Sequence, residues 1–133
     1  MSFSWFCRVF VDSAVLPVCH QLYSILLDPP TAPIITGFSE SPILGDVVDL
    51  TCQASGGNPF PTLVWYRNDE THQLSYQTNL EEKRVESILT FTISESDNGA
   101  VYRCESSNPA QTTPQSAQVR FQVKCKYSLI LVY

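Results

Sequence analysis

The chain has 133 residues, 44% of them hydrophobic and 16% charged, which suits one globular domain with a buried core. Its formal net charge is −5 at pH 7, and its lysines and arginines do not cluster. Such a weakly acidic chain is a poor candidate for binding nucleic acid or an anionic membrane surface.

The first 27 residues are largely apolar but interrupted. Arg8 falls inside the apolar stretch, and Pro17 and His20 break the part that follows. A secretory signal has a basic start, an unbroken apolar stretch and a small-residue cleavage site. A membrane-spanning helix has about 20 apolar residues with few charges. The segment matches neither pattern well. The sequence favours the end of a partial chain and leaves a signal peptide and a membrane span open.

A proline-rich stretch follows, with three prolines among residues 28–33. Prolines lack an amide hydrogen and resist helices and inner strands, so this stretch predicts a stiff junction between modules. We therefore expect residues 1–29, an atypical apolar segment and a proline-rich junction, to lie outside the fold. Residues 30–124 are expected to form the domain.

Short runs rich in β-formers, separated by turn residues, fill the chain from Ile34 onward. Apolar and polar residues alternate within them, as at Val48, Leu50 and Cys52. The expected strands include residues 33–38, 47–52, 63–66, 89–93, 102–104 and 117–123, with a loop at 56–61. Each strand is half apolar and needs a facing sheet to cover it. The pattern therefore predicts an all-β sandwich of two antiparallel sheets.

Residues 125–133 form a short apolar tail after the last expected strand. Its final seven residues carry no charge and are too few to cross a bilayer. We expect this tail to lie outside the domain.

Four residues at characteristic spacing give the chain a resemblance to the immunoglobulin superfamily. Trp65 follows Cys52 by 13 residues, and Tyr102 precedes Cys104 by two. The resemblance implies a disulfide between Cys52 and Cys104 that joins the sheets. It also implies that Trp65 packs against this bridge and that Tyr102 forms the tyrosine corner. The implied fold is an immunoglobulin-like sandwich of the intermediate or constant-like set.

Three local runs narrow the resemblance. They are residues 52–59, 65–67 and 97–104, and they are similar to domains of nephrin and irregular-chiasm/roughest type adhesion receptors. Those receptors carry tandem immunoglobulin domains at the cell surface. One departure is visible: the family often has Asp six residues before the second cysteine, where this chain has Asn98 and places Asp97 one residue earlier.

The sequence carries no convincing motif for catalysis or cofactor binding. Residues 37–41 begin like a nucleophile elbow but lack its closing glycine. His20 and His72 lie far apart, and no Cys-x-x-Cys pair offers a zinc site. We expect no enzyme activity, cofactor, metal or small-molecule substrate.

The five cysteines suggest an oxidising compartment. Cys7, Cys19 and Cys125 fall outside the expected domain and are predicted to be dispensable. No Asn-x-Ser/Thr glycosylation site occurs in the sequence. An extracellular location therefore depends on the disulfide pattern alone.

Strand alternation divides the residues into a core and two outward faces. The predicted core includes Leu50, Trp65, Leu89, Phe91 and Tyr102. The predicted partner-binding face consists of Val64, Tyr66, Arg103, Glu105, Gln118 and Arg120. Tyr and Arg are favoured at interfaces. The other sheet presents Asp49, Thr51, Thr90 and Thr92, a short polar set that predicts plain solvated surface.

These features favour an extracellular recognition module of a cell-surface adhesion receptor. Its partners would be other immunoglobulin-superfamily proteins, bound homophilically or heterophilically. The membrane would be reached only through parts of the receptor outside this chain. Two alternatives stay open: a structural spacer in a tandem array, and a soluble immune-type binding domain.

Overall fold

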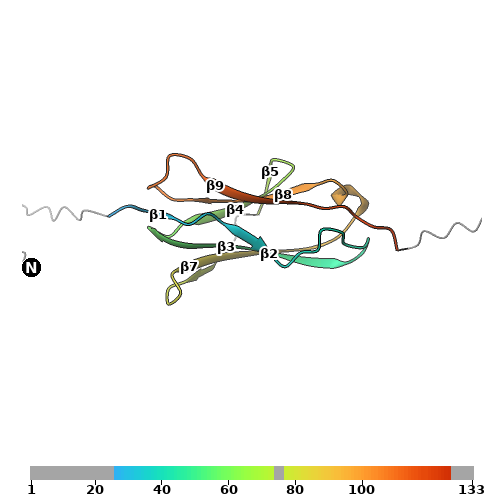
Figure 1. Cartoon of the computed structure of the whole chain (residues 1–133), viewed down its shortest axis with the longest axis horizontal. Helices are drawn as coiled ribbons and strands as arrows, with labels where there is room; N and C mark the ends of the chain where they lie inside the picture. Colours follow the sequence, from blue (N-terminus) through green and yellow to red (C-terminus); the bar gives the residue numbers. More distant parts are fainter. Residues whose placement is uncertain (1–25, 74–76, 127–133) are drawn as a thin grey trace, which may run out of the picture.

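The computed structural model describes residues 26–73 and 77–126, which form two antiparallel sheets packed face to face (Figure 1). One sheet runs in the order β1 (Asp28–Pro30), β3 (Val47–Asn58), β7 (Arg84–Thr92) and β6 (Gln77–Asn79), with β2 (Ile34–Thr36) also paired to β3. The other runs β5 (Glu70–Gln73), β4 (Thr62–Arg67), β8 (Val101–Ser107) and β9 (Gln115–Arg120). The predicted all-β sandwich is confirmed.

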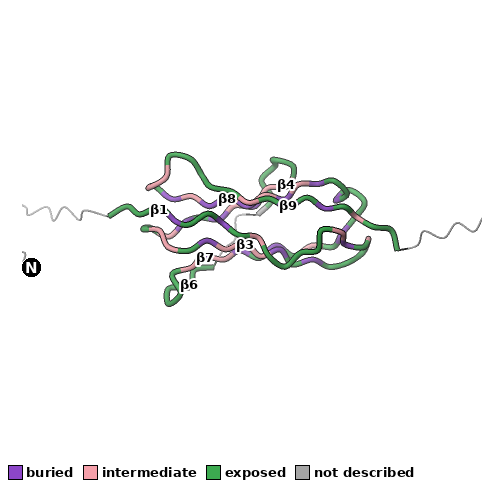
Figure 2. The backbone as a smooth tube through the Cα atoms, viewed as in Figure 1, coloured by how far each residue is buried: buried purple, intermediate pink, exposed green. Residues whose placement is uncertain are grey.

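Alternating sequence patterns produce the buried layer between the sheets (Figure 2). In β3, Val48, Leu50 and Cys52 are buried between neighbours that are exposed or half-buried. In β8, Tyr102 and Cys104 follow the same rule. Successive strand residues point to opposite faces, so each sheet contributes one apolar face to a shared core.

The predicted core residues occupy this layer. Leu50, Trp65, Leu89 and Tyr102 are buried. Phe91 is half-buried instead, and its ring stacks on that of Tyr102 with the centroids 4.6 Å apart. Phe91 lies near the end of β7 and packs against the edge of the core.

The fold begins earlier than the sequence predicts. Asp28 and Pro30 pair with Asn58 and Gly56 of β3, and Pro30 is buried. Assigning residues 28 and 29 to a junction outside the fold was wrong. β1 is an edge strand, where a proline needs to donate no hydrogen bond on its outer side. The loop predicted at 56–61 is limited to residues 59–61, because β3 continues through Asn58 to pair with β1.

The predicted strand at 33–38 is shorter than expected, because the chain leaves the first sheet at Gly37. This residue has φ +83°, and a Cβ at this position would collide with the Asp49 carbonyl oxygen. The chain then crosses to the other sheet. There the Gln122 amide donates to the Glu40 carbonyl at 3.0 Å, and Ile43 forms a parallel bridge with Lys124.

Several predictions fall on the terminal segments. Cys7, Cys19 and the last seven residues of the tail lie outside the described residues, and Cys125 is exposed and unpaired. The ends predicted for the domain otherwise stay predictions. Within residues 26–73 and 77–126, no helix is long and apolar enough to cross a membrane.

Candidate functional site

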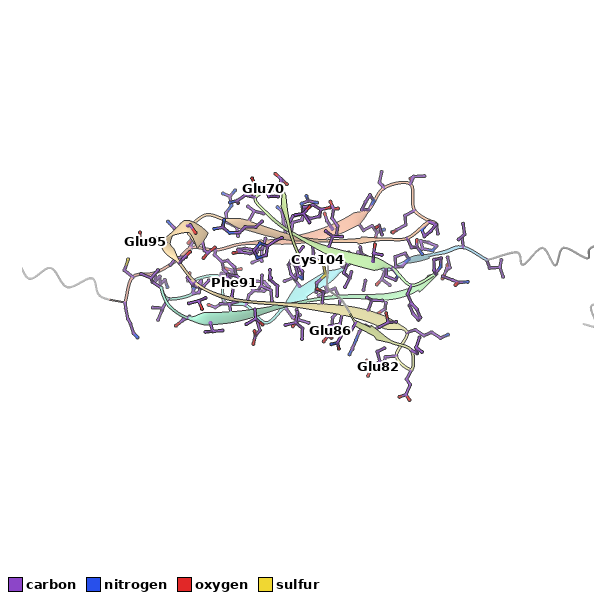
Figure 3. The ribbon with its side chains drawn as sticks, turned by 180° about the vertical axis from the view of Figure 1, so that it is seen from behind. Glu70, Glu82, Glu86, Phe91, Glu95 and Cys104 are labelled. Atoms are coloured by element: carbon purple, nitrogen blue, oxygen red, sulfur yellow. A yellow bond between two sulfur atoms is a disulfide. The ribbon has the colours of Figure 1, made fainter. Side chains whose placement is uncertain are left out.

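A disulfide joins the two sheets at the middle of the sandwich. Cys52 of β3 and Cys104 of β8 are bonded across a Cα–Cα distance of 6.4 Å, and both are fully buried. Trp65 of β4, also fully buried, lies directly opposite Cys104 on the neighbouring strand. Figure 3 shows Cys104 between the two layers. The Cys52–Cys104 disulfide and the Trp65 indole hold β4 and β8 in place. These two strands carry most of the predicted partner-binding face.

A polar cluster holds the end of the sandwich next to η1 (Glu95–Asp97). The Tyr102 hydroxyl donates to Asp97 Oδ1 at 2.8 Å, and Arg67 Nη2 lies 3.0 Å from the same oxygen. The amide and hydroxyl of Ser94 donate to Asp97 Oδ2 at 2.8 and 2.7 Å. Asp97 therefore joins β4, β8 and the turn that follows β7.

This role of Asp97 was not predicted, because the family pattern places its Asp at position 98, where this chain has Asn98. In the structure, the hydroxyl of Tyr102, the tyrosine-corner residue, donates to the Asp97 carboxylate. Asn98 instead accepts a hydrogen bond from the Val123 amide at 3.1 Å, which ties the turn to the segment that follows β9. The Ser-x-x-Asp spacing of residues 94–97, a capping-box pattern, is the sequence signal that could have found it.

The ionisation of the cluster is set by burial and hydrogen bonding. Burial by itself would raise the pKa of the Asp97 carboxyl. The hydrogen bonds from Ser94, Tyr102 and Arg67 outweigh burial and lower this pKa from 3.8 to about 2. Burial, together with the bond to Asp97, raises the pKa of Tyr102 to about 12. The hydrogen bond to Asp97 also raises the pKa of Arg67. Near neutral pH, the carboxylate and guanidinium are charged and the phenol is neutral.

The predicted partner-binding face is built across β4, β8 and β9. The strand register places Tyr66, Arg103 and Gln118 side by side in one row. Val64 and Glu105 form the next row toward one end, and Arg120 lies on the other side of Gln118. Val64, Tyr66, Arg103 and Glu105 are half-buried, whereas Gln118 and Arg120 are exposed. The structure thus brings all six residues to one surface, which we call the β4–β8–β9 face.

Arg103 occupies the centre of the β4–β8–β9 face. Its guanidinium carbon lies 4.3 Å from the centroid of the Tyr66 ring, within the range of a cation–π interaction. It forms an ion pair with Glu105, and its Nη2 lies 3.3 Å from Asp69 Oδ1. Asp69 was not predicted, because it comes from the tight turn between β4 and β5 with φ +67°. These contacts hold a planar cation in one orientation at the surface.

The outward face of the other sheet differs. Asp49, Thr90 and Thr92 are exposed, and Thr90 donates a hydrogen bond to Asp49 at 2.6 Å. Thr51 is half-buried. The prediction of a wholly polar surface was incomplete, because the Ile88 side chain is 50% exposed beside Thr51.

In the described part of the chain, no group of three His, Cys, Asp or Glu residues is placed to hold a metal ion. Glu70 projects from the β4–β5 hairpin at one edge of the face, as Figure 3 shows. The β4–β8–β9 face presents aromatic, aliphatic and charged groups on one surface.

A two-sheet antiparallel sandwich with a buried intersheet disulfide and a tyrosine corner defines an immunoglobulin-type domain. The family model described as "Immunoglobulin domain" matches residues 32–108. The chain belongs to this family, as its resemblance predicted.

Two groups of relatives indicate the kind of protein that carries such a domain. Human nephrin is 31% identical over 129 residues, which cover 95% of this chain and 10% of nephrin. Cell adhesion molecule 2 of Xenopus tropicalis is 34% identical over 104 residues, which cover 74% of this chain and 24% of that protein. The chain thus spans a tenth to a quarter of the length of these relatives.

Solved structures agree with the fold. The full ectodomain of mouse nectin-like molecule 4 superposes with a TM-score of 0.63 at 25% identity, covering 74% of this chain and 35% of that one. The D1-D2 structure of Rst superposes with a TM-score of 0.64 at 24% identity, covering 74% of this chain and 51% of that one. The chain is an immunoglobulin domain homologous to those of cell adhesion proteins.

Proposed function

We propose that the chain is an extracellular recognition module of a cell-surface adhesion receptor and binds a protein partner through its β4–β8–β9 face. Its similarity to nephrin and cell adhesion molecule 2 supports the class of protein. The observation that carries the choice of face is Arg103, which stacks on Tyr66 and contacts two carboxylates.

Pre-organisation is the physical reason for this choice. Binding normally costs the ordering of flexible side chains at the interface. Here the guanidinium and the phenol ring already support each other, so less rotamer freedom remains to be lost. Tyr and Arg also supply large contact areas with directional hydrogen bonds. The outward face of the other sheet mixes short polar side chains with the exposed Val47 and Ile88, and among the described residues it carries no arginine stacked on an aromatic ring.

The charges of the β4–β8–β9 face are balanced, because Arg103 and Arg120 are matched by Glu105 and Asp69. A balanced face favours a partner with a similar mixture, such as another immunoglobulin-superfamily surface protein, either identical or different.

The disulfide fits the oxidising extracellular side of the plasma membrane. The proposal assigns no catalytic step, cofactor or small-molecule substrate to the chain.

The test displays the chain on beads and measures bead aggregation and attachment to cultured cells. Val64→Arg and Tyr66→Ala alter the face, and Val64→Arg would place its charge opposite Glu105 without disturbing the core. Thr92→Arg is the matched control, since it adds the same charge to the exposed surface of the other sheet. We expect both face variants to bind at least tenfold more weakly and the control to bind like the unaltered chain.

The spacer and soluble-binder alternatives predict other results. A domain that only sets distance in an array would give no binding, or binding that all three variants share. A soluble immune-type binder would attach to cells without aggregating beads, even at high surface density. Circular dichroism and thermal unfolding of each variant show whether a loss of binding reflects a loss of fold.

A further inference from the structure

Strand β9 ends the four-stranded sheet, and its outer edge is only half covered. Beyond the strand, the amides of Gln122 and Lys124 donate to the carbonyls of Glu40 and Pro42 at 3.0 and 2.9 Å. Alongside Gln115–Arg120 itself, no strand of the described residues pairs on the outer side. Residues 40–42, which cover the edge beyond Arg120, lead back toward β2 and leave the edge along Gln115–Arg120 open.

The direction of the backbone groups at this edge follows from the neighbouring hydrogen bonds. The Phe121 amide donates to Ala100 at the β8 side, whereas the Gln122 amide donates to Glu40 on the opposite side. Backbone groups alternate in direction along a strand. The amide and carbonyl groups of Ser116, Gln118 and Arg120 therefore face the open edge, in a row centred on Gln118.

A groove lies beside this edge. It has a volume of about 320 Å³, and its walls are the 38–41 segment on one side and β9 on the other. Phe38 contributes an apolar wall and is 39% exposed. The groove therefore gives an additional strand room to approach the outward backbone groups of Gln118 and Arg120.

We propose that a second copy of this chain pairs its β9 antiparallel to this edge, with a twofold axis at Gln118. Ser116 of each copy then lies opposite Arg120 of the other, and the two Gln118 residues face each other. Residues paired in this way exchange both backbone hydrogen bonds. The two four-stranded sheets become one continuous sheet, and the pairing closes because the contact is the same on both copies.

The ends of the pairing fit the same register. One step beyond Arg120, the Gln122 amide is already bonded to Glu40, so it needs no new partner. Pro114, which precedes the paired residues in the second copy, has no amide hydrogen to leave unpaired. The strand pairing thus stops without leaving an amide donor unpaired.

The charges favour this register as well. Arg120 is exposed and, among the described residues, forms no ion pair within its own chain. In the dimer it lies opposite Ser116 of the second copy, and Glu105 of that copy is the next residue in the same row. A long side chain reaches such a neighbour. The two Arg120 side chains lie on opposite sides of the axis and do not meet.

This inference goes beyond the proposed function, because it involves the edge of the sheet and leaves Val64 and Tyr66 free. A contact of one strand is small, so we expect a weak dimer with a Kd of about 0.1–1 mM. Such affinity becomes effective when many copies are concentrated on one membrane.

The experiment is sedimentation equilibrium of the full chain at concentrations up to about 1 mM. Cys7, Cys19 and Cys125 are replaced by Ser to exclude intermolecular disulfides. Gln118→Pro removes the outward amide at the twofold axis, at an edge position where proline is tolerated. Gln118→Ala, the matched control, keeps that amide. We expect dimers for the parent and Gln118→Ala, and monomers for Gln118→Pro.

A second pair of variants keeps the test decisive if Gln118→Pro does not fold. Ser116→Asp would face Arg120 of the second copy and should tighten the dimer about three- to tenfold. Ser116→Lys should weaken it by a similar factor. Within one copy, residue 116 faces Glu105, so thermal unfolding of the monomer should change in the opposite order. A monomeric parent, or a dimer equally strong in all the variants, overturns the proposal. A dimer that is equally strong in all the variants also shows that the chain associates through parts other than the β9 edge.

Discussion

The sandwich has two buried cross-links, and they stabilise it in different ways. The disulfide Cys52–Cys104 joins the sheets near the middle of the molecule. The Asp97 cluster joins β4, β8 and the turn after β7 at one end through hydrogen bonds and an ion pair. The first acts mainly by restricting the unfolded chain. The second acts in the native state and depends on a charged carboxylate.

The two cross-links therefore support the β4–β8–β9 face in different ways. The bridge should stabilise the domain equally across a wide pH range, because a disulfide does not titrate. The cluster fixes how the ends of β4 and β8 lie relative to each other, and these strands carry the β4–β8–β9 face. Its contribution should depend on pH. Substitutions and changes of pH can therefore separate the two contributions.

Replacing both Cys52 and Cys104 by Ala should cause the largest loss. The sequence separation of 52 residues corresponds to about 4 kcal/mol of unfolded-state entropy. Urea denaturation at pH 7 and again at pH 3 measures it, and we expect the same loss at both values. A loss of less than about 1 kcal/mol, or one that changes strongly with pH, would contradict the unfolded-state account.

Asp97→Ala should lower the free energy of unfolding by about 3 kcal/mol, because it leaves Arg67, Tyr102 and the Ser94 amide without their acceptor. Asp49→Ala is the matched control. Its carboxylate accepts one hydrogen bond, from an exposed Thr90, and should cost at most about 0.5 kcal/mol. Equal losses for the two variants, measured by urea denaturation, would show that the Asp97 cluster is not a cross-link.

Acid should remove the stabilisation by Asp97 progressively. Its folded-state pKa of about 2 lies below the ordinary value of 3.8, so the unfolded chain takes up the proton at a higher pH. The contribution is present above about pH 4 and is lost as the pH falls toward 2, and it amounts to about 2 kcal/mol. Subtracting the pH profile of Asp97→Asn from that of the parent isolates it. A flat difference between pH 5 and pH 2 would refute the assignment.

The sequence predicted those parts of the fold that follow from strand alternation and cysteine spacing. Val48, Leu50 and Cys52 repeat with the period of a strand, and only a facing sheet can cover them. The edges were less predictable. Asp28 and Pro29 were assigned to a junction outside the fold because proline opposes inner strands, but β1 is an edge strand, where that argument does not apply.

The candidate face was predictable in composition but not in geometry. Alternation placed Tyr66 and Arg103 on the same outward surface, and the structure agrees. Their stacking, and the contact of Arg103 with Asp69, depend on register across three strands and on a left-handed turn. Asp97 was missed for a similar reason, since its partners Arg67 and Tyr102 are distant in sequence or on another strand.

The smallest effect concerns the surface contacts of Arg103, which are a third and weaker kind of link. Arg103→Met keeps the aliphatic stem but removes the guanidinium that stacks on Tyr66 and pairs with Glu105. Ion pairs and cation–π contacts of half-buried side chains at a protein surface contribute little, so we expect a loss of about 0.5–1 kcal/mol.

Arg120→Met is the matched control, because Arg120 lies on the same face without an ion pair among the described residues. It should leave the free energy of unfolding unchanged. The ionic share of the Arg103 effect should shrink in 1 M salt, where charges are screened beyond about 3 Å, and the stacking share should remain. If Arg103→Met costs as much as Asp97→Ala, Arg103 supports the fold as well as the face, and binding lost on its replacement no longer identifies a contact with the partner.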